Sequence, residues 1–147
     1  MNPIESAVQM FEEGYSCSQA MLCAFAPRYG LDRDLALKIA SPFGGGIAKQ
    51  GLSCGAMTGA ILVLGLHGGR TDPDDVETRE KNDALVREFM ARYSKDNGAT
   101  MCNDLTGVDI SDAEARTAAQ EAGVYAGICP NLVRYAAGLV LELIERP

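Results

Sequence analysis

The 147-residue sequence has no tryptophan, a single histidine and fewer basic than acidic residues. One histidine excludes catalysis by several histidines and metal sites built from several imidazoles. The 13 lysines and arginines are outnumbered by 20 aspartates and glutamates, which gives a net charge of −7. Because this charge repels phosphate groups, we expect no nucleic-acid partner and no attraction to anionic membrane surfaces.

Long hydrophobic runs are also missing. The most apolar stretches, residues 60–66 and 136–141, are much shorter than the roughly 18 residues of a membrane span. The N-terminal residues carry Glu5, Glu12 and Glu13 and no basic-then-apolar pattern, so we expect no signal peptide. The prediction is a cytoplasmic protein without membrane insertion, in a compartment where thiols stay reduced and structural disulfides are unfavourable.

Helix signals are dense, and few segments alternate between polar and apolar residues. Caps, prolines and glycines predict helices over residues 2–14, 16–26, 32–41, 54–66 and 72–96, the last opened by Thr71 or Asp72. Ser111 and Glu114 have the spacing of a further capping box, and residues 99–110 read as irregular. A last helix is expected after Cys129 and Pro130. The sequence therefore predicts an all-α, single-domain bundle of about six helices over residues 1–147.

The five cysteines are the main candidates for chemistry. Cys17, Cys54, Cys102 and Cys129 are widely separated, and no Cys-x-x-Cys pair is present. The missing pair argues against a zinc knuckle and against a thioredoxin-type motif, since both need two thiols in one tight turn. If these cysteines act together, the fold has to assemble them from distant segments.

Three of these cysteines, Cys17, Cys54 and Cys129, lie at predicted helix starts. A helix start offers unpaired N–H groups and a partial positive charge, which favour a thiolate over a thiol. A lowered thiol pKa suits a nucleophile, a redox group or a metal ligand. The alternative is that the cysteines are small apolar core residues, and this is the expected role of Cys23, which lies in the middle of a predicted helix.

Residues 43–51 are rich in glycine but match no nucleotide-binding motif. A P-loop would need Lys-Ser or Lys-Thr after Gly51, and a dinucleotide fingerprint would need glycine where Lys49 stands. A steric role fits better, because glycine amides can approach and donate to a thiolate or a cluster sulfide beside Cys54. We take Gly55 and Gly59 as candidate cofactor-binding positions, with close helix packing as the alternative for Gly59.

Cys17 in a Ser-Cys-Ser-Gln context, the glycine-rich loop, Cys54-Gly-Ala-Met-Thr-Gly59, Cys102 and Cys129 together resemble the C_GCAxxG_C_C family. The central motif here reads Cys-Gly-Ala, where the family label has Gly-Cys-Ala. The resemblance covers nearly the whole chain and implies a redox-active or electron-transfer protein. It also implies that Cys17, Cys54, Cys102 and Cys129 are the functional residues, and Cys23 lies outside its pattern.

Three functions stay open at this point. The first is ligation of an iron–sulfur cluster or another thiolate-bound metal by the four cysteines, for which four thiolates suffice. The second is cycling between dithiol and disulfide, with three pairings allowed. The non-enzymatic alternative is a helical interaction module or structural metal-binding module with packing cysteines. The expected partners are a redox partner protein and, as a homodimer, a second copy of the chain.

Overall fold

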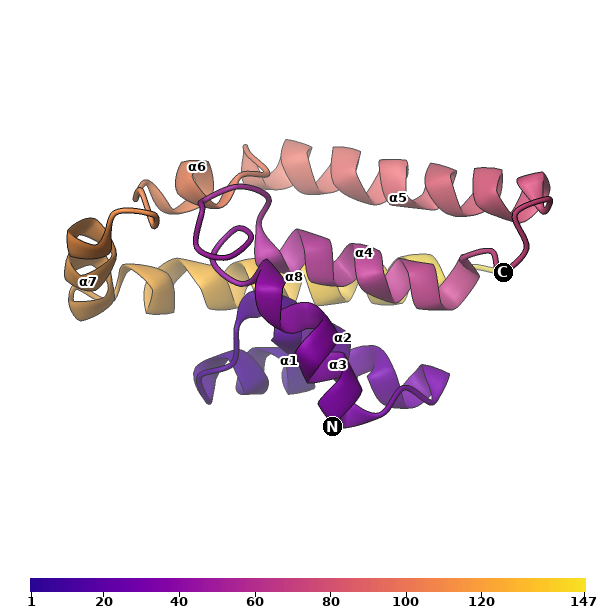
Figure 1. The fold of residues 1–147 in the computed structure, drawn as a ribbon, viewed down its shortest axis with the longest axis horizontal. Helices are drawn as coiled ribbons and strands as arrows, with labels where there is room; N and C mark the ends of the chain where they lie inside the picture. Colours follow the sequence, from indigo (N-terminus) through magenta and orange to yellow (C-terminus); the bar gives the residue numbers. More distant parts are fainter.

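The computed structural model describes residues 1–147 and contains eight α-helices and no β-strand (Figure 1). The helices are α1 (Pro3–Glu12), α2 (Cys17–Phe25), α3 (Arg33–Ala40), α4 (Gly55–Gly68), α5 (Val76–Asn97), α6 (Cys102–Thr106), α7 (Ala113–Glu121) and α8 (Val124–Ile144). Two short 3₁₀ helices cover Ala26–Tyr29 and Ser41–Phe43. The all-α class is confirmed. The count of about six helices is too low, and α6 lies in the segment expected to be irregular.

The first three helices begin where their capping residues predict. The Asn2 side chain accepts a hydrogen bond from the N–H of Glu5 (2.9 Å), and Pro3 occupies the first helical position. At α2, Ser16 and Gln19 form a reciprocal capping box. Asp32 caps α3 through the N–H of Leu35 (3.1 Å).

Three later helix starts differ from the prediction. Asp75, not Thr71 or Asp72, caps α5, because the Asp72 carboxylate accepts from the N–H of Asp74 in a preceding turn (2.9 Å). Asp112 caps α7, while the hydroxyl of Ser111 is bonded to Asp109 (2.5 Å). The third difference is at α8, which begins at Val124 and contains Pro130 in its interior.

The prediction that Cys129 lies at the start of a helix is therefore wrong, because Cys129 lies inside α8. Gly123, in the left-handed conformation (φ 75°), precedes α8 and sets its start one and a half turns before the proline. A proline inside a helix removes one backbone hydrogen bond but does not always end the helix. Here, buried apolar residues continue on both sides of Pro130, so packing maintains the helix.

The helices share one hydrophobic core of 27 buried residues. In Figure 1, α4 and α8 run through the middle, with α5 on one side and α1, α2 and α3 on the other. The contact between α2 and α4 depends on Gly59, where an added Cβ would lie 2.7 Å from the Cβ of Met21. By length and composition, α8 could cross a membrane, but half of it is buried by the other helices, as in a core helix.

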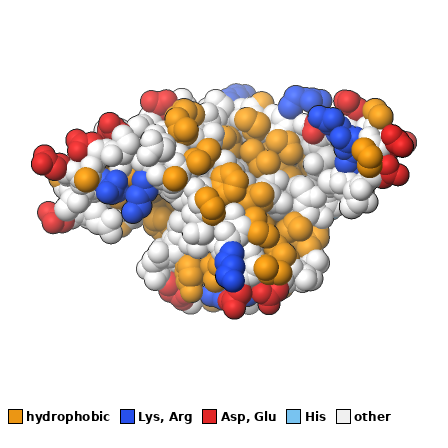
Figure 2. All heavy atoms as spheres, in the orientation of Figure 1, with side chains coloured by type: hydrophobic (Ala, Val, Ile, Leu, Met, Phe, Trp, Pro, Cys, Tyr) orange, Lys and Arg blue, Asp and Glu red, His pale blue; other side chains and the backbone are white.

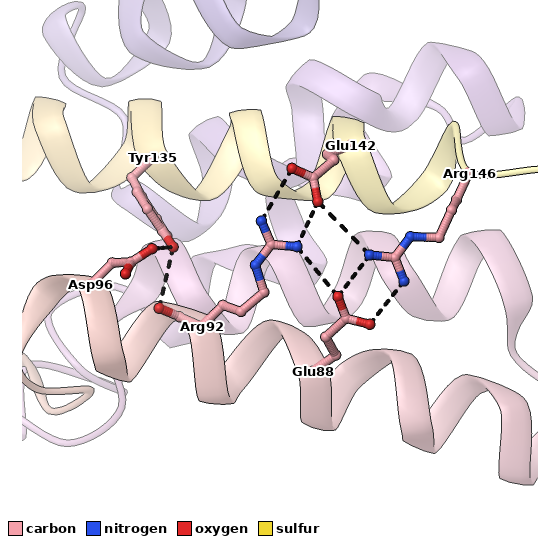
Figure 3. A network of polar contacts seen from close by, with 6 residues as sticks. All are labelled: Glu88, Arg92, Asp96, Tyr135, Glu142 and Arg146. Carbon is pink, nitrogen blue, oxygen red and sulfur yellow. Dashed lines mark hydrogen bonds and ion pairs between the residues drawn. The ribbon is translucent and has the colours of Figure 1, made fainter.

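A network of exposed ion pairs joins α5 to the end of α8 (Figure 3). Arg146 bonds both carboxylate oxygens of Glu88 (2.8 and 2.7 Å), and Arg92 lies between Glu88 and Glu142. About two turns before Glu142 on α8, the hydroxyl of Tyr135 donates to Asp96. Because α5 buries only Phe89 and Tyr93, these polar contacts supplement a narrow apolar contact.

Candidate functional site: a cavity lined by four cysteines

Cys17, Cys54, Cys102 and Cys129 line one cavity of about 890 Å³. All four are free thiols. The fifth, Cys23, lines a separate surface pocket beside Glu13 and Arg33. The fold thus brings together the four cysteines of the family pattern, although they come from α2, the start of α4, α6 and α8.

Local backbone structure places the first three thiols. Cys17 is the first residue of α2, directly after the capping box at Ser16. Cys54 precedes α4, and its N–H donates to the carbonyl of Thr100 (2.8 Å). The N–H of Cys102 donates to the carbonyl of Leu52 (2.6 Å). This short antiparallel contact holds Cys54 and Cys102 on adjacent segments.

The glycine-rich loop forms another wall of the cavity. Five consecutive residues, Gly45 to Lys49, have positive φ between 50° and 69°. Three of them are not glycine, and each such residue costs about 1–2 kcal/mol in this conformation. The resulting left-handed turn brings the backbone of Gly46 against Cys102, where an added Cβ would lie 2.8 Å from the Cβ of Cys102. Glycine is therefore required sterically at position 46.

The two candidate cofactor-binding glycines lie in different places. Gly55 lines the cavity, and an added Cβ would lie 3.2 Å from the Cβ of Cys17. Gly59 does not line the cavity but faces α2, where it allows close helix packing. The position of Gly59 therefore agrees with the packing alternative.

Cys17 and Cys129 interact through their side chains. Hydrogen bonding to Cys129 raises the pKa of Cys17, and burial and the charges of the other three cysteines raise it further. The same hydrogen bond lowers the pKa of Cys129, although burial opposes this effect. Since a neighbouring thiol that donates stabilises a thiolate, Cys129 is the member of the pair whose thiolate is favoured.

Cys54 has a different set of partners. Its Sγ lies 3.2 Å from the hydroxyl oxygen of Tyr93, a fully buried residue of α5. Burial raises the pKa of Cys54, while hydrogen bonds from Tyr93 and from the N–H groups of Ala56 and Met57 lower it. Tyr93 lies in the helix that the sequence predicts over residues 72–96. No sequence signal indicated that its hydroxyl reaches a cysteine 39 positions away.

Cys102 is the fourth thiol of the cavity. Burial, followed by the charges of Cys54 and Cys129, raises its pKa to about 11. Cys102 is therefore protonated at neutral pH. Of the four thiols, only Cys129 has a pKa shifted toward the thiolate.

A single metal ion does not fit this arrangement. No three histidine, cysteine, aspartate or glutamate side chains lie close enough together to hold one ion. Structural zinc sites need four ligand atoms within bonding distance of one centre. A mononuclear structural metal is thus not supported by the positions of these thiols.

Comparison with known proteins gives one match. The family model described as "Putative redox-active protein (C_GCAxxG_C_C)" matches residues 15–143, which include all four cavity cysteines. No curated protein and no solved structure matches the chain. With nearly the whole chain matched, this protein belongs to the C_GCAxxG_C_C family.

Proposed function

We propose that this protein carries out thiol–disulfide exchange, with Cys129 as the nucleophile and Cys17 as the resolving thiol. The observation that carries the proposal is that both side chains line one cavity and that the pKa of Cys129 is lowered through its interaction with Cys17. A nucleophilic cysteine needs a stabilised thiolate, and a resolving cysteine has to lie next to it. The lowered pKa supports Cys129 as the nucleophile, and the interaction supports Cys17 as its resolving partner.

The proposed reaction has two exchange steps. The Cys129 thiolate attacks one sulfur of a disulfide-containing substrate, the substrate S–S bond breaks, and the other substrate sulfur leaves as a thiolate. Cys17 then loses its proton and attacks the Cys129 sulfur, which releases the second substrate sulfur. The substrate disulfide gains two electrons and leaves as two thiolates, which take up the proton lost by Cys17 and a second proton from water, and the protein is left with a Cys17–Cys129 disulfide.

The order of the steps follows from the charges. The thiolate of Cys129 raises the pKa of Cys17 while the pair is reduced. In the mixed disulfide Cys129 carries no charge, so that contribution disappears and Cys17 loses its proton more readily. Cys54 and Cys102, with raised pKa values, stay uncharged at neutral pH and leave Cys129 as the thiol of the cavity that is favoured to ionise.

A second candidate function is electron transfer by an iron–sulfur cluster. It is favoured by one observation, that all four thiols and the glycine backbone of residues 44–46 line the same cavity. A cluster spreads its iron atoms, so its ligands lie farther apart than those of a single ion, and amides near the sulfurs tune its potential. Cys17, Cys54, Cys102 and Cys129 would be the ligands.

One preparation tests both functions. The protein is purified without oxygen, and its iron content and visible absorption are measured. Reduced protein is then exposed to 2-hydroxyethyl disulfide, alkylated and digested, and its peptides are identified by mass spectrometry. We expect a colourless protein and a Cys17–Cys129 link that is lost in Cys17→Ser and Cys129→Ser and retained in the control Cys23→Ser. A brown, iron-containing protein without this link would support the cluster instead.

A further inference from the structure

The hydroxyl of Tyr125 is a buried donor without a partner. It is the one buried side-chain oxygen or nitrogen in residues 1–147 that makes no hydrogen bond. Burying an unsatisfied polar group costs about 1–3 kcal/mol, and such groups are rare in folded proteins. The missing partner is therefore a hydrogen-bond acceptor from outside the chain, which reaches this solvent-shielded oxygen once the cavity wall shifts to admit it.

Tyr125 lies where that acceptor would be. It is in the first turn of α8, one turn before Cys129, and it lines the four-cysteine cavity. Cys102 and Cys129 line the same cavity, and after burial their negative charge raises the pKa of Tyr125 further. Yet no cysteine accepts a hydrogen bond from Tyr125, whereas Cys54 does contact the hydroxyl of Tyr93. The acceptor that suits Tyr125 is thus not a sulfur of the protein.

Arg116 adds positive charge beside this hydroxyl. One of its nitrogens donates to the carbonyl of Ile110 (2.8 Å), which holds the side chain in the cavity wall. Both residues line the cavity, and the guanidinium opposes the rise in the pKa of Tyr125. None of the ion pairs in the protein includes Arg116, so its positive charge is not neutralised by a carboxylate. A donor next to a free positive charge suits an anionic acceptor.

Building on the proposed thiol–disulfide exchange, we infer that Tyr125 is a catalytic residue that donates a hydrogen bond to the substrate sulfur that leaves as a thiolate. When Cys129 attacks, negative charge develops on the departing sulfur, on the cavity side of Cys129. A donor fixed at that position stabilises the developing charge, and Arg116 strengthens the effect. The substrate class is a disulfide whose leaving thiol is basic enough to need such help.

The test compares two disulfides that differ in their leaving groups. 2-Hydroxyethyl disulfide releases a basic thiolate, while 5,5′-dithiobis(2-nitrobenzoic acid) releases an acidic one that leaves readily without a donor. We expect Tyr125→Phe to slow the reaction with the first by about tenfold to a hundredfold, the size of a hydrogen bond to a charged group. The second should change by less than about twofold, because its leaving group needs no stabilisation.

Tyr15→Phe is the matched control. Tyr15 lines the same cavity, but its hydroxyl already accepts a hydrogen bond from Arg33 (3.5 Å). We expect this variant to react with both disulfides at the wild-type rate. Equal slowing of both disulfides by Tyr125→Phe would indicate only a packing role and overturn the inference, as would unchanged rates with both.

A measurement on the wild-type protein keeps the inference testable if Tyr125→Phe does not fold. Rates are measured with a series of disulfides of rising leaving-thiol pKa, for the protein and for N-acetylcysteine. A donor in the site predicts a shallower dependence for the protein, and an equal slope would overturn the inference. Wild-type protein that reacts without forming the Cys17–Cys129 link would instead overturn the proposed function.

Discussion

At the scale of single residues, the hydroxyl of Tyr93 controls the state of Cys54. Its hydrogen bond lowers the pKa of that thiol against the effect of burial. Tyr93→Phe removes the bond and should raise the Cys54 pKa, so the Cys54 peptide should be alkylated more slowly by iodoacetamide at a given pH. The measurement is alkylation against pH by mass spectrometry, with Tyr29→Phe, altered only at an exposed contact to His67, as the control. An unchanged Cys54 profile would contradict this role.

A second prediction concerns the thiolate of Cys129. Its pKa is lowered by the hydrogen bond from Cys17. Cys17→Ala removes the donor, so burial alone acts and the Cys129 pKa should rise. The pH at which Cys129 becomes half-reactive toward iodoacetamide should then move upward, with Cys23→Ala as the unaffected control. A downward shift would show that Cys17 does not donate to Cys129.

The sequence identified the four cysteines that the fold brings to one cavity but not which side chains each of them would contact. The resemblance singled out the four cysteines that share the cavity, and the capping rules placed Cys17 correctly at a helix start. Nothing in the spacing of the cysteines indicated that Cys17 would meet Cys129 rather than Cys54 or Cys102. That pairing depends on how α2 packs against α8, which no local pattern specifies.

At the scale of elements, the left-handed turn from Gly45 to Lys49 stores strain beside the site. Ala48 has φ 50° and is exposed. Ala48→Gly removes the steric cost of this conformation, so it should stabilise the protein by about 0.5–1 kcal/mol after the entropy cost of glycine. Urea denaturation measures the change. The control Ala118→Gly, at an exposed position of α7, should destabilise by up to about 1 kcal/mol.

Helix signals were reliable at the start of the chain and less so later. Asn2, Ser16 and Asp32 cap the helices that the sequence predicted. In α8, Pro130 suggested a helix start, but the apolar residues before it are held in helical form by the core. A tertiary contact thus overrode a local signal, which the sequence alone could not reveal.

At the scale of the whole molecule, the ion pairs between α5 and α8 predict a loss of stability in acid. Hydrogen bonds and charge from Arg146, and then from Arg92, lower the pKa of Glu88 from 4.5 to about 2. A lowered carboxylate pKa stabilises the fold above the unfolded value, and the contribution is lost as pH falls from about 4.5 to about 2. Since Glu88 is partly exposed, salt should weaken the effect.

Glu88→Gln tests this contribution. The free energy of unfolding of the Glu88→Gln variant should fall less than that of the wild type between pH 5 and pH 2.5, as measured by urea denaturation at each pH. Glu80→Gln, on the same helix but without an ion pair, is the matched control and should follow the wild type. Parallel pH curves for Glu88→Gln and the wild type would contradict the role of the network.

Oxidation should change global stability as well. A Cys17–Cys129 disulfide would close a loop of roughly 110 residues and restrict the unfolded chain, which is worth about 4–5 kcal/mol. The oxidised protein should therefore unfold at a higher urea concentration than the reduced protein, and Cys17→Ser should show no such difference. Equal midpoints for both wild-type forms would contradict formation of this link.

The contact of Tyr93 with Cys54 provides a natural fluorescent reporter of the cysteine site. With no tryptophan and only five tyrosines, the ultraviolet emission of the protein comes from tyrosine alone. Thiolates and disulfides quench the emission of a phenol ring that lies next to them, the Tyr93 hydroxyl lies 3.2 Å from Cys54, and Tyr125 lines the cavity of the four cysteines. Turnover should therefore be visible as a change in brightness of the unlabelled protein.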